Sequence, residues 1–146
     1  MNNLSLAYLG DAVFELYIRE YLINKKIYKV NDLQKESLNY ITAPSQRKIL
    51  ENLINESILT EEEIEIVKRG RNASSHKSKT TDIVTYHMST GFECLIGYLY
   101  LNNKERLKEI MEKYKLRKKY HRLKDGTFLI LDKNRDLDFI DTLEKN

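Results

Sequence analysis

The segment from about Leu4 to Ile23 limits what this chain can fold into more than any other part of the sequence. Its apolar side chains recur at so many positions that they would cover nearly every face of a helix. We therefore predict a central, largely buried helix here. The 146 residues contain one proline and five glycines, so long stretches of the chain are free to be helical. Together these features predict an all-α fold.

Helix-capping residues mark the beginnings of further helices. Thr60 followed by Glu63 matches a capping box, and Gly70 is predicted to end the helix that follows in a left-handed cap. Thr81 or Asp82 could cap the next helix, which is also strongly apolar. The helices predicted after the first one span roughly residues 31–40, 43–54, 61–70, 82–101 and 104–116. These helices are expected to form one bundle.

Residues 117–146 differ in composition from the rest of the chain. They open with a cluster of basic residues and close with an acidic stretch. Between the two, Asp125-Gly126 indicates a turn, and Thr127 to Leu131 could form a short strand. We therefore divide the chain into a helical domain, residues 1–116, and a basic-then-acidic C-terminal extension, residues 117–146.

Composition and charge exclude several classes of protein. The net charge is only +3 although 32% of the residues are charged, which does not by itself indicate nucleic-acid binding. The single cysteine, Cys94, rules out an internal disulfide framework and favours a reducing, cytoplasmic setting. The sequence shows no secretory signal and no apolar run of the roughly 20 residues of a membrane span, so a membrane protein is not expected.

Two acidic residues lie within the two most apolar predicted helices. Asp11 is in the middle of the first, and Glu93 occupies a similar place in the fifth. A buried carboxylate requires a cation, a metal ion or several hydrogen-bond donors. Magnesium prefers one or two carboxylates together with water and phosphate oxygens, so the two acids could hold Mg²⁺. The small residues near Glu93, Ser89, Thr90 and Gly97, leave room for an ion, a phosphate or a closely packed helix.

A structural ion pair would explain the same acids without a ligand. Glu15 lies one helical turn beyond Asp11 on the same face. Either acid could pair with one of three arginines, Arg19, Arg69 and Arg71. Because structural ion pairs also bury acids, the pattern alone leaves both interpretations open.

A basic segment follows the fourth predicted helix. No acidic residue interrupts the interval between Glu65 and Asp82. A basic loop of this kind can follow a phosphate backbone, and an ordinary solvated loop explains it as well. The candidate nucleic-acid-binding residues are Lys68, Arg69, Arg71, Asn72, Lys77 and Lys79.

Three motifs occur in an order and at spacings that resemble one enzyme family. Residues 6–13, Leu-Ala-Tyr-Leu-Gly-Asp-Ala-Val, resemble the signature helix of the ribonuclease III family. Residues 91–101, which contain Glu93, resemble the second acidic motif of that family. Residues 69–73, followed by residues 81–82 and 85–86, are similar to the Mini-III branch in particular. The resemblance covers roughly residues 4 to 115.

The resemblance implies an all-helical endonuclease domain that works as a homodimer and cuts both strands of double-stranded RNA with Mg²⁺. Mini-III enzymes lack the separate RNA-binding domain of larger relatives, and the branch is associated with maturation of large-subunit (23S) ribosomal RNA in bacteria. A ribosomal protein could present the substrate. By position, Asp11 matches the catalytic, metal-binding aspartate and Glu93 matches the metal-binding glutamate.

The chain departs from the broader family at three acidic positions. Where that family usually has glutamates seven and four residues before the signature aspartate, this chain has Leu4 and Ala7. Where it usually has an aspartate three residues before the second-motif glutamate, this chain has Thr90. The carboxylate set is therefore reduced. Glu15 could be a further metal ligand or could hold Arg71, and we favour the second role.

The sequence thus predicts a Mg²⁺-dependent endoribonuclease of the cytoplasm. Two other interpretations share some of its features. An RNA-binding helical module with a depleted, non-catalytic acidic site would bind RNA without turnover. A structural helical protein would use its acids only in salt bridges to Arg69 and Arg71.

Overall fold

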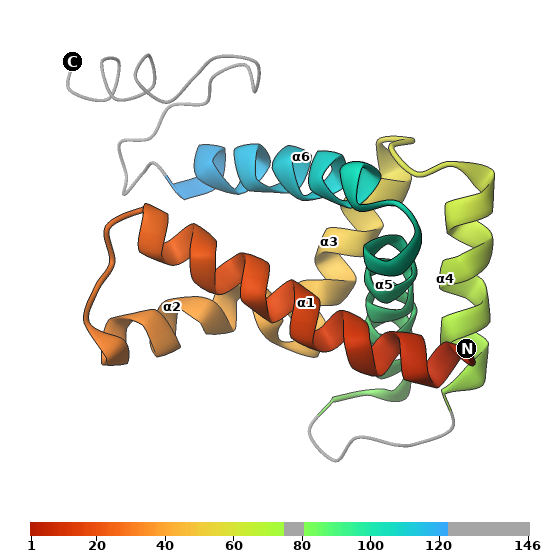
Figure 1. Ribbon diagram of the computed structural model, residues 1–146. Coiled ribbons are helices and arrows are strands. Elements are labelled where there is room, and N and C mark those ends of the chain that lie inside the picture. The colour runs from red at the N-terminus through yellow and green to blue at the C-terminus, as the bar shows by residue number, and fades with distance from the viewer. Residues whose placement is uncertain (75–80, 123–146) are drawn as a thin grey trace. The chain divides into compact units, whose positions relative to one another are not determined.

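The described part of the chain is entirely helical. The computed structural model describes the backbone of residues 1–74 and 81–122, and the side chains of these residues up to 113. The helices in these ranges are α1 (Asn3–Asn24), α2 (Val30–Ile41), α3 (Ala43–Asn55), α4 (Glu61–Ala73), α5 (Ile83–Asn102) and α6 (Lys104–Arg122) (Figure 1). The all-α prediction is confirmed, and none of the described helices is long and apolar enough to cross a membrane. The strand predicted at residues 127–131 lies outside the described residues.

Residues Met1–Leu107 form one compact unit, which contains every site discussed below, and Lys108–Asn146 form a second unit. α6 runs from the first unit into the second and extends past residue 116. The domain boundary predicted after residue 116 therefore stays a prediction.

Capping side chains start several helices where the sequence predicts them. The capping box of Thr60 and Glu63 is present, with each side chain accepting a hydrogen bond from the backbone N–H of the other residue. Asp82 caps α5 by accepting a hydrogen bond from the Thr85 N–H at 2.8 Å. α2 begins at Val30, one residue before the predicted start at residue 31.

The central helix is α5, which α1, α3 and α4 all contact. Phe92, Cys94, Leu95 and Ile96 are four of its fully buried residues. The prediction that α1 is largely buried is wrong. Only eight of its 22 residues are buried, because α5 and the neighbouring helices cover one side of it. The apolar residues on the other side stay exposed, including Leu4, Tyr8 and Leu16.

α1 and α5 cross in direct backbone contact. A Cβ atom on Gly10 would overlap the carbonyl oxygen of Glu93, and a Cβ atom on Gly97 would overlap the carbonyl oxygen of Leu6. Only glycine fits at either position, because the obstructing atoms belong to backbone and cannot rotate away. Of the roles predicted for the small residues near Glu93, close helix packing is the one that Gly97 fulfils.

A second glycine contact joins α4 to α5. A Cβ atom on Gly70 would lie 2.5 Å from the Cβ of Cys94, and one on Gly91 would lie 2.7 Å from the carbonyl oxygen of Val67. The prediction that Gly70 ends α4 in a left-handed cap is wrong, because the helix continues to Ala73. Gly70 is instead required where the two helices approach each other.

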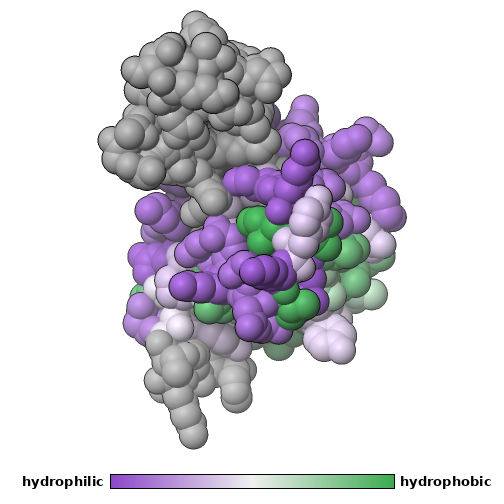
Figure 2. All heavy atoms as spheres, turned by 90° about the vertical axis from the view of Figure 1, so that its left-hand side faces the viewer, coloured by the Kyte–Doolittle hydropathy of each residue, from purple (hydrophilic) through white to green (hydrophobic). Residues whose placement is uncertain are grey.

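The surface at the α1–α2 end of the first unit is mostly hydrophilic. Figure 2 shows charged and polar side chains over this face, with apolar side chains in small groups among them. The exposed apolar residues of this region include Ile23, Tyr28 and Val30. Scattered apolar residues of this kind are normal on protein surfaces and indicate no binding site.

Replacing Gly97 with alanine tests the backbone contact. Alanine is the better helix former, so propensity alone predicts a gain in stability. We expect Gly97→Ala instead to lower the free energy of unfolding by about 2–3 kcal/mol, because its Cβ must displace the Leu6 backbone. Chemical denaturation measures the difference. Lys48→Ala, at an exposed position of α3, is the control and should change stability by less than about 0.5 kcal/mol. An unchanged or higher stability of Gly97→Ala would contradict the contact.

Candidate active site

The helix crossing brings Asp11 and Glu93 together. Asp11 follows Gly10 in α1, and Gly10 lies against the main chain of Glu93 in α5. The two carboxyl groups interact directly, by charge and through a side-chain hydrogen bond. Asp11 is exposed and Glu93 is half-buried. The expectation that Asp11 is buried is therefore wrong, because α1 presents that residue on the side that no other helix covers.

The surroundings of Glu93 favour its protonated form. Burial raises the pKa of Glu93 most, the neighbouring charge of Asp11 and a hydrogen bond with Asp11 raise it further, and Gln46 lowers it. The resulting pKa is about 8, well above the ordinary value of 4.5. In the absence of a cation, Glu93 therefore holds a proton at neutral pH.

The structural ion pair considered for Asp11 is not formed. Glu15 accepts a hydrogen bond from Nε of Arg19 at 3.1 Å, one turn further along α1. The favoured pairing of Glu15 with Arg71 is therefore wrong, because Glu15 pairs with Arg19 in its own helix. Across residues 1–74 and 81–113, no salt bridge involves Asp11 or Glu93.

Glu63 shows what a structural acid looks like in this fold. It is 5% exposed, and its carboxylate accepts hydrogen bonds from Nε of Arg106 at 2.7 Å and from the N–H of Thr60 at 3.0 Å. Burial would raise the pKa of Glu63, but the hydrogen bonds and charge of Arg106, with the Thr60 hydrogen bond, lower it overall. Among the described residues Glu93 has no such cation, so its environment differs from that of a structural ion pair.

The acidic pair fits a hydrated divalent ion. Two acidic groups that avoid mutual repulsion only because one of them holds a proton form a donor set that a hard cation would stabilise. Mg²⁺ commonly uses one or two protein carboxylates and keeps several waters. Within the part of the chain that the structure describes, no group of three or more His, Cys, Asp or Glu residues could hold a metal. Among the described residues, the candidate metal site therefore offers two carboxylates, those of Asp11 and Glu93.

Thr90 does not replace the missing acid. Its hydroxyl is buried and donates a hydrogen bond to the carbonyl oxygen of Tyr86 at 3.0 Å, within the preceding turn of α5. The hydroxyl of Ser89 donates to the same carbonyl oxygen at 3.1 Å. The Thr90 hydroxyl also lies 3.5 Å from the hydroxyl of Ser74 at the end of α4, so both small residues make hydrogen bonds within the fold.

The candidate RNA-binding residues lie at the end of α4 and beyond it. Lys68, Arg69 and Asn72 are exposed, and Arg71 is half-buried. Lys77 and Lys79 lie outside the described residues. The structure does not test whether these six side chains contact RNA, so their role stays a prediction.

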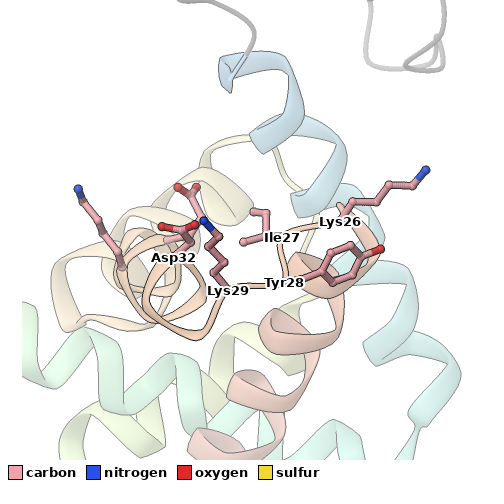
Figure 3. A pocket seen from close by; sticks show the side chains of 7 residues that line it. Lys26, Ile27, Tyr28, Lys29 and Asp32 are labelled. Atoms are coloured by element: carbon pink, nitrogen blue, oxygen red, sulfur yellow. The ribbon is translucent and has the colours of Figure 1, made fainter.

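A shallow hollow at the α1–α2 turn is lined by residues that do not include the acidic pair. Figure 3 shows Lys26 and Lys29 beside Ile27, Tyr28 and Asp32. The labelled lysine side chains extend in different directions and do not converge on one point. This hollow therefore lacks the convergent polar groups of a catalytic site.

Gln46 is the residue of the site that the sequence analysis missed. It is 1% exposed in α3, and it acts on the Glu93 carboxylate in favour of the charged form. One signal in the sequence could have indicated it. Gln46 shares a helical face with Ile49, Leu50 and Leu53, where a polar residue is out of place.

The stability of the metal-free protein should depend on pH through Glu93. Because the folded-state pKa of about 8 lies above the ordinary 4.5, the contribution of Glu93 is fully present below pH 4.5 and is lost as pH rises towards 8. In EDTA, we expect the free energy of unfolding of the wild type to fall, relative to that of Glu93→Gln, by up to about 1 kcal/mol for each pH unit between pH 4.5 and 8. Thermal denaturation between pH 5 and 8 measures the difference. Glu15→Gln is the control, and its stability should depend on pH like that of the wild type. If the stabilities of the wild type and Glu93→Gln change equally with pH, the raised pKa of Glu93 is contradicted.

Comparison with known proteins identifies the family to which this fold belongs. The ribonuclease III domain profile matches residues 4–104. The chain is 47% identical over 113 residues to Mini-ribonuclease 3 of Streptococcus pneumoniae. The aligned residues cover 76% of this chain and 88% of that relative. The chain is 46% identical over 115 residues to Mini-ribonuclease 3 of Staphylococcus aureus, with 77% and 86% covered. A crystal structure of a Fusobacterium nucleatum protein superposes with a TM-score of 0.69 at 33% identity, over 77% of this chain and 91% of that one. The chain therefore belongs to the ribonuclease III family, in its Mini-ribonuclease 3 branch.

Proposed function

We propose that this chain is an endoribonuclease that cleaves double-stranded RNA at the Asp11–Glu93 pair with Mg²⁺. One observation carries the proposal. The fold forces two carboxylates together and supplies no basic side chain to pair with them among the described residues, so that Glu93 retains a proton near neutral pH. A divalent ion that replaces this proton would turn an unfavourable arrangement into a stable one. Membership of the ribonuclease III family supports the same conclusion.

Asp11 and Glu93 have different surroundings and therefore different tasks. The half-buried Glu93 is held by the α5 backbone at the helix crossing and would anchor the ion. The exposed Asp11 would bind the ion where a scissile phosphate can approach from solvent. When bound, Mg²⁺ supplies an activated water and stabilises charge at the phosphate.

The basic residues near the end of α4 would bind the RNA backbone. Lys68, Arg69, Arg71, Asn72, Lys77 and Lys79 are the candidates, and three of the four that the structure describes are exposed. Lys and Arg would add salt-sensitive affinity for phosphate. Double-stranded RNA would be recognised mainly by its shape and its 2′-hydroxyl groups across the minor groove.

A homodimer would cover the exposed apolar residues on both sides of the end of α4. Tyr8 is 85% exposed and Leu4 is 48% exposed, and both line a hollow together with Ala73 of α4. Val84 is 55% exposed and lines a second hollow with Arg71 and Asn72 of α4. Large exposed apolar side chains around one point indicate a contact surface. A two-fold dimer would bring together two acidic pairs, one for each RNA strand.

The substrate in the cell would be a precursor of large-subunit (23S) ribosomal RNA, and the enzyme would act in the cytoplasm. The support for this is the branch of the family, whose named relatives come from bacteria. A ribosomal protein could present the RNA.

Replacing Asp11 with asparagine tests the catalytic role. The exposed carboxylate is not needed for folding, so Asp11→Asn should keep the wild-type unfolding midpoint. We expect it to cleave double-stranded RNA at least about 100-fold more slowly in Mg²⁺, because one of two metal-binding carboxylates is lost. A gel assay of cleavage in Mg²⁺ and in EDTA measures the effect.

RNA binding by the same variant separates the interpretations. Asp11→Asn should bind double-stranded RNA like the wild type in a filter-binding assay, and Glu15→Gln should cleave normally. Normal cleavage by Asp11→Asn would overturn the assignment of Asp11. Magnesium-independent binding without cleavage by the wild type would favour the RNA-binding module instead.

Replacing Tyr8 with glutamate tests the dimer. A charge at this exposed apolar position should prevent two α1 helices from packing, so Tyr8→Glu should sediment as a monomer where the wild type sediments as a dimer. Leu101→Glu is the matched control, because Leu101 is 48% exposed and lies at the end of α5 opposite to Val84. This variant should sediment like the wild type. A dimer formed equally by Tyr8→Glu, or a wild type that is monomeric at micromolar concentration, would exclude this surface as the interface.

A further inference from the structure

Gln46 is a buried amide whose polar atoms make no full hydrogen bond to the described residues. Its side chain is 1% exposed, and neither the amide nitrogen nor the amide oxygen makes a hydrogen bond with any described residue. Leaving such a group unsatisfied destabilises a folded protein. A glutamine kept only for packing would be expected to have partners for these atoms.

The amide lies where α3 packs against α5. Gln46 lies on the buried face of α3 with Ile49, Leu50 and Leu53, and α3 contacts α5. Its side chain acts on the carboxylate of Glu93, although without the distance and angle of a full hydrogen bond. The Gln46 amide therefore lies on the core face of α3 and close enough to Glu93 to act on its carboxylate.

Neighbouring contacts hold this part of α3 in place. Thr42 caps the helix by accepting a hydrogen bond from the N–H of Ser45 at 3.3 Å. Nη1 of Arg47 donates to the hydroxyl of Thr85 in α5 at 2.8 Å. Gln46 lies between these two anchors in the chain, so its backbone has little freedom to move away from α5.

The His87 ring, which also has a buried polar atom without a hydrogen bond to the described residues, differs from Gln46. Nε2 of His87 is buried and has no partner among the described residues, but the Nδ1 atom of the same ring lies 3.0 Å from the carbonyl oxygen of Arg71. Half of that ring is therefore satisfied within the fold. In Gln46, by contrast, neither the nitrogen nor the oxygen of the amide makes a hydrogen bond to the described residues. An amide can donate two N–H groups and can accept at its oxygen.

We propose that Gln46 is a positioning residue of the active site, whose amide N–H donates to the Glu93 carboxylate in the metal-loaded state and so orients that carboxylate towards the ion. This inference rests on the proposed function. A glutamine suits the task because it donates without adding charge to a pair of acids that already repel each other. Its amide oxygen remains to accept a hydrogen bond from water.

Gln46→Met tests this role, because methionine fills a similar volume and removes the amide. The metal-free variant should fold and be at least as stable as the wild type, since an unsatisfied buried polar group is lost. The Mn²⁺ concentration for half-maximal rise of the unfolding temperature should increase about 10-fold or more. Titration of Mn²⁺ and Mg²⁺ by thermal denaturation measures this without any cleavage assay.

Two further variants locate the effect. Gln34→Met makes the same change at an exposed position of α2 and should bind metal like the wild type. In a Glu93→Gln background, Gln46→Met should cause no further loss of metal affinity, because the carboxylate that it positions is absent. Gln46→Leu repeats the test with a second apolar side chain.

The outcomes separate this inference from the proposed function. If the wild type gains no stability from Mn²⁺ or Mg²⁺ and does not cleave RNA, the proposed function fails. If the wild type responds to metal and both Gln46 variants respond equally well, the positioning role is overturned. Loss of folding in both apolar variants would overturn it as well, because it would show that the amide serves the fold.

Discussion

Direct contact between the backbones of α1 and α5 is the constraint on which the rest of the structure depends. Gly10 and Gly97 let the two helices meet with no side chain between them, and Gly10 touches the main chain of Glu93 itself. The position of the acidic pair is therefore determined by two rigid helices and not by loops. A second glycine contact, between Gly70 and Cys94, holds α4 against the same central helix.

Two glutamates in this small domain show how environment decides the role of an acid. Glu63 is more deeply buried, yet Arg106 and Thr60 satisfy it and lower its pKa. Among the described residues, the side chains that act on Glu93 are Asp11 and Gln46, and the Gln46 amide makes no full hydrogen bond. The pKa of Glu93 therefore rises to about 8. Burial alone thus does not distinguish a structural carboxylate from a functional one. The distinguishing feature is whether the protein itself supplies the compensating cation.

Most of the fold could be predicted from local signals, because capping boxes and apolar spacing act within a few residues. The Thr60–Glu63 box and the Asp82 cap are examples. The burial of α1 could not be predicted, since an apolar side chain looks the same whether it faces a core or an exposed surface, as Tyr8 does. Asp11 and Glu93 could be named from motifs. The apolar face of α3 could indicate that Gln46 is buried, but only the packing of α3 on α5 relates it to Glu93.

The exposure of Asp11 has a consequence for how fast the site can be loaded. Because this carboxylate already faces solvent, a hydrated ion can reach it without any opening of the helical core. Exchange of the ion would then be limited by the rate at which it sheds its own water, which is slow for Mg²⁺, and not by fluctuations of the protein. The helix crossing would stay fixed while the ion comes and goes, so only the proton of Glu93 and the Gln46 amide would change between turnovers.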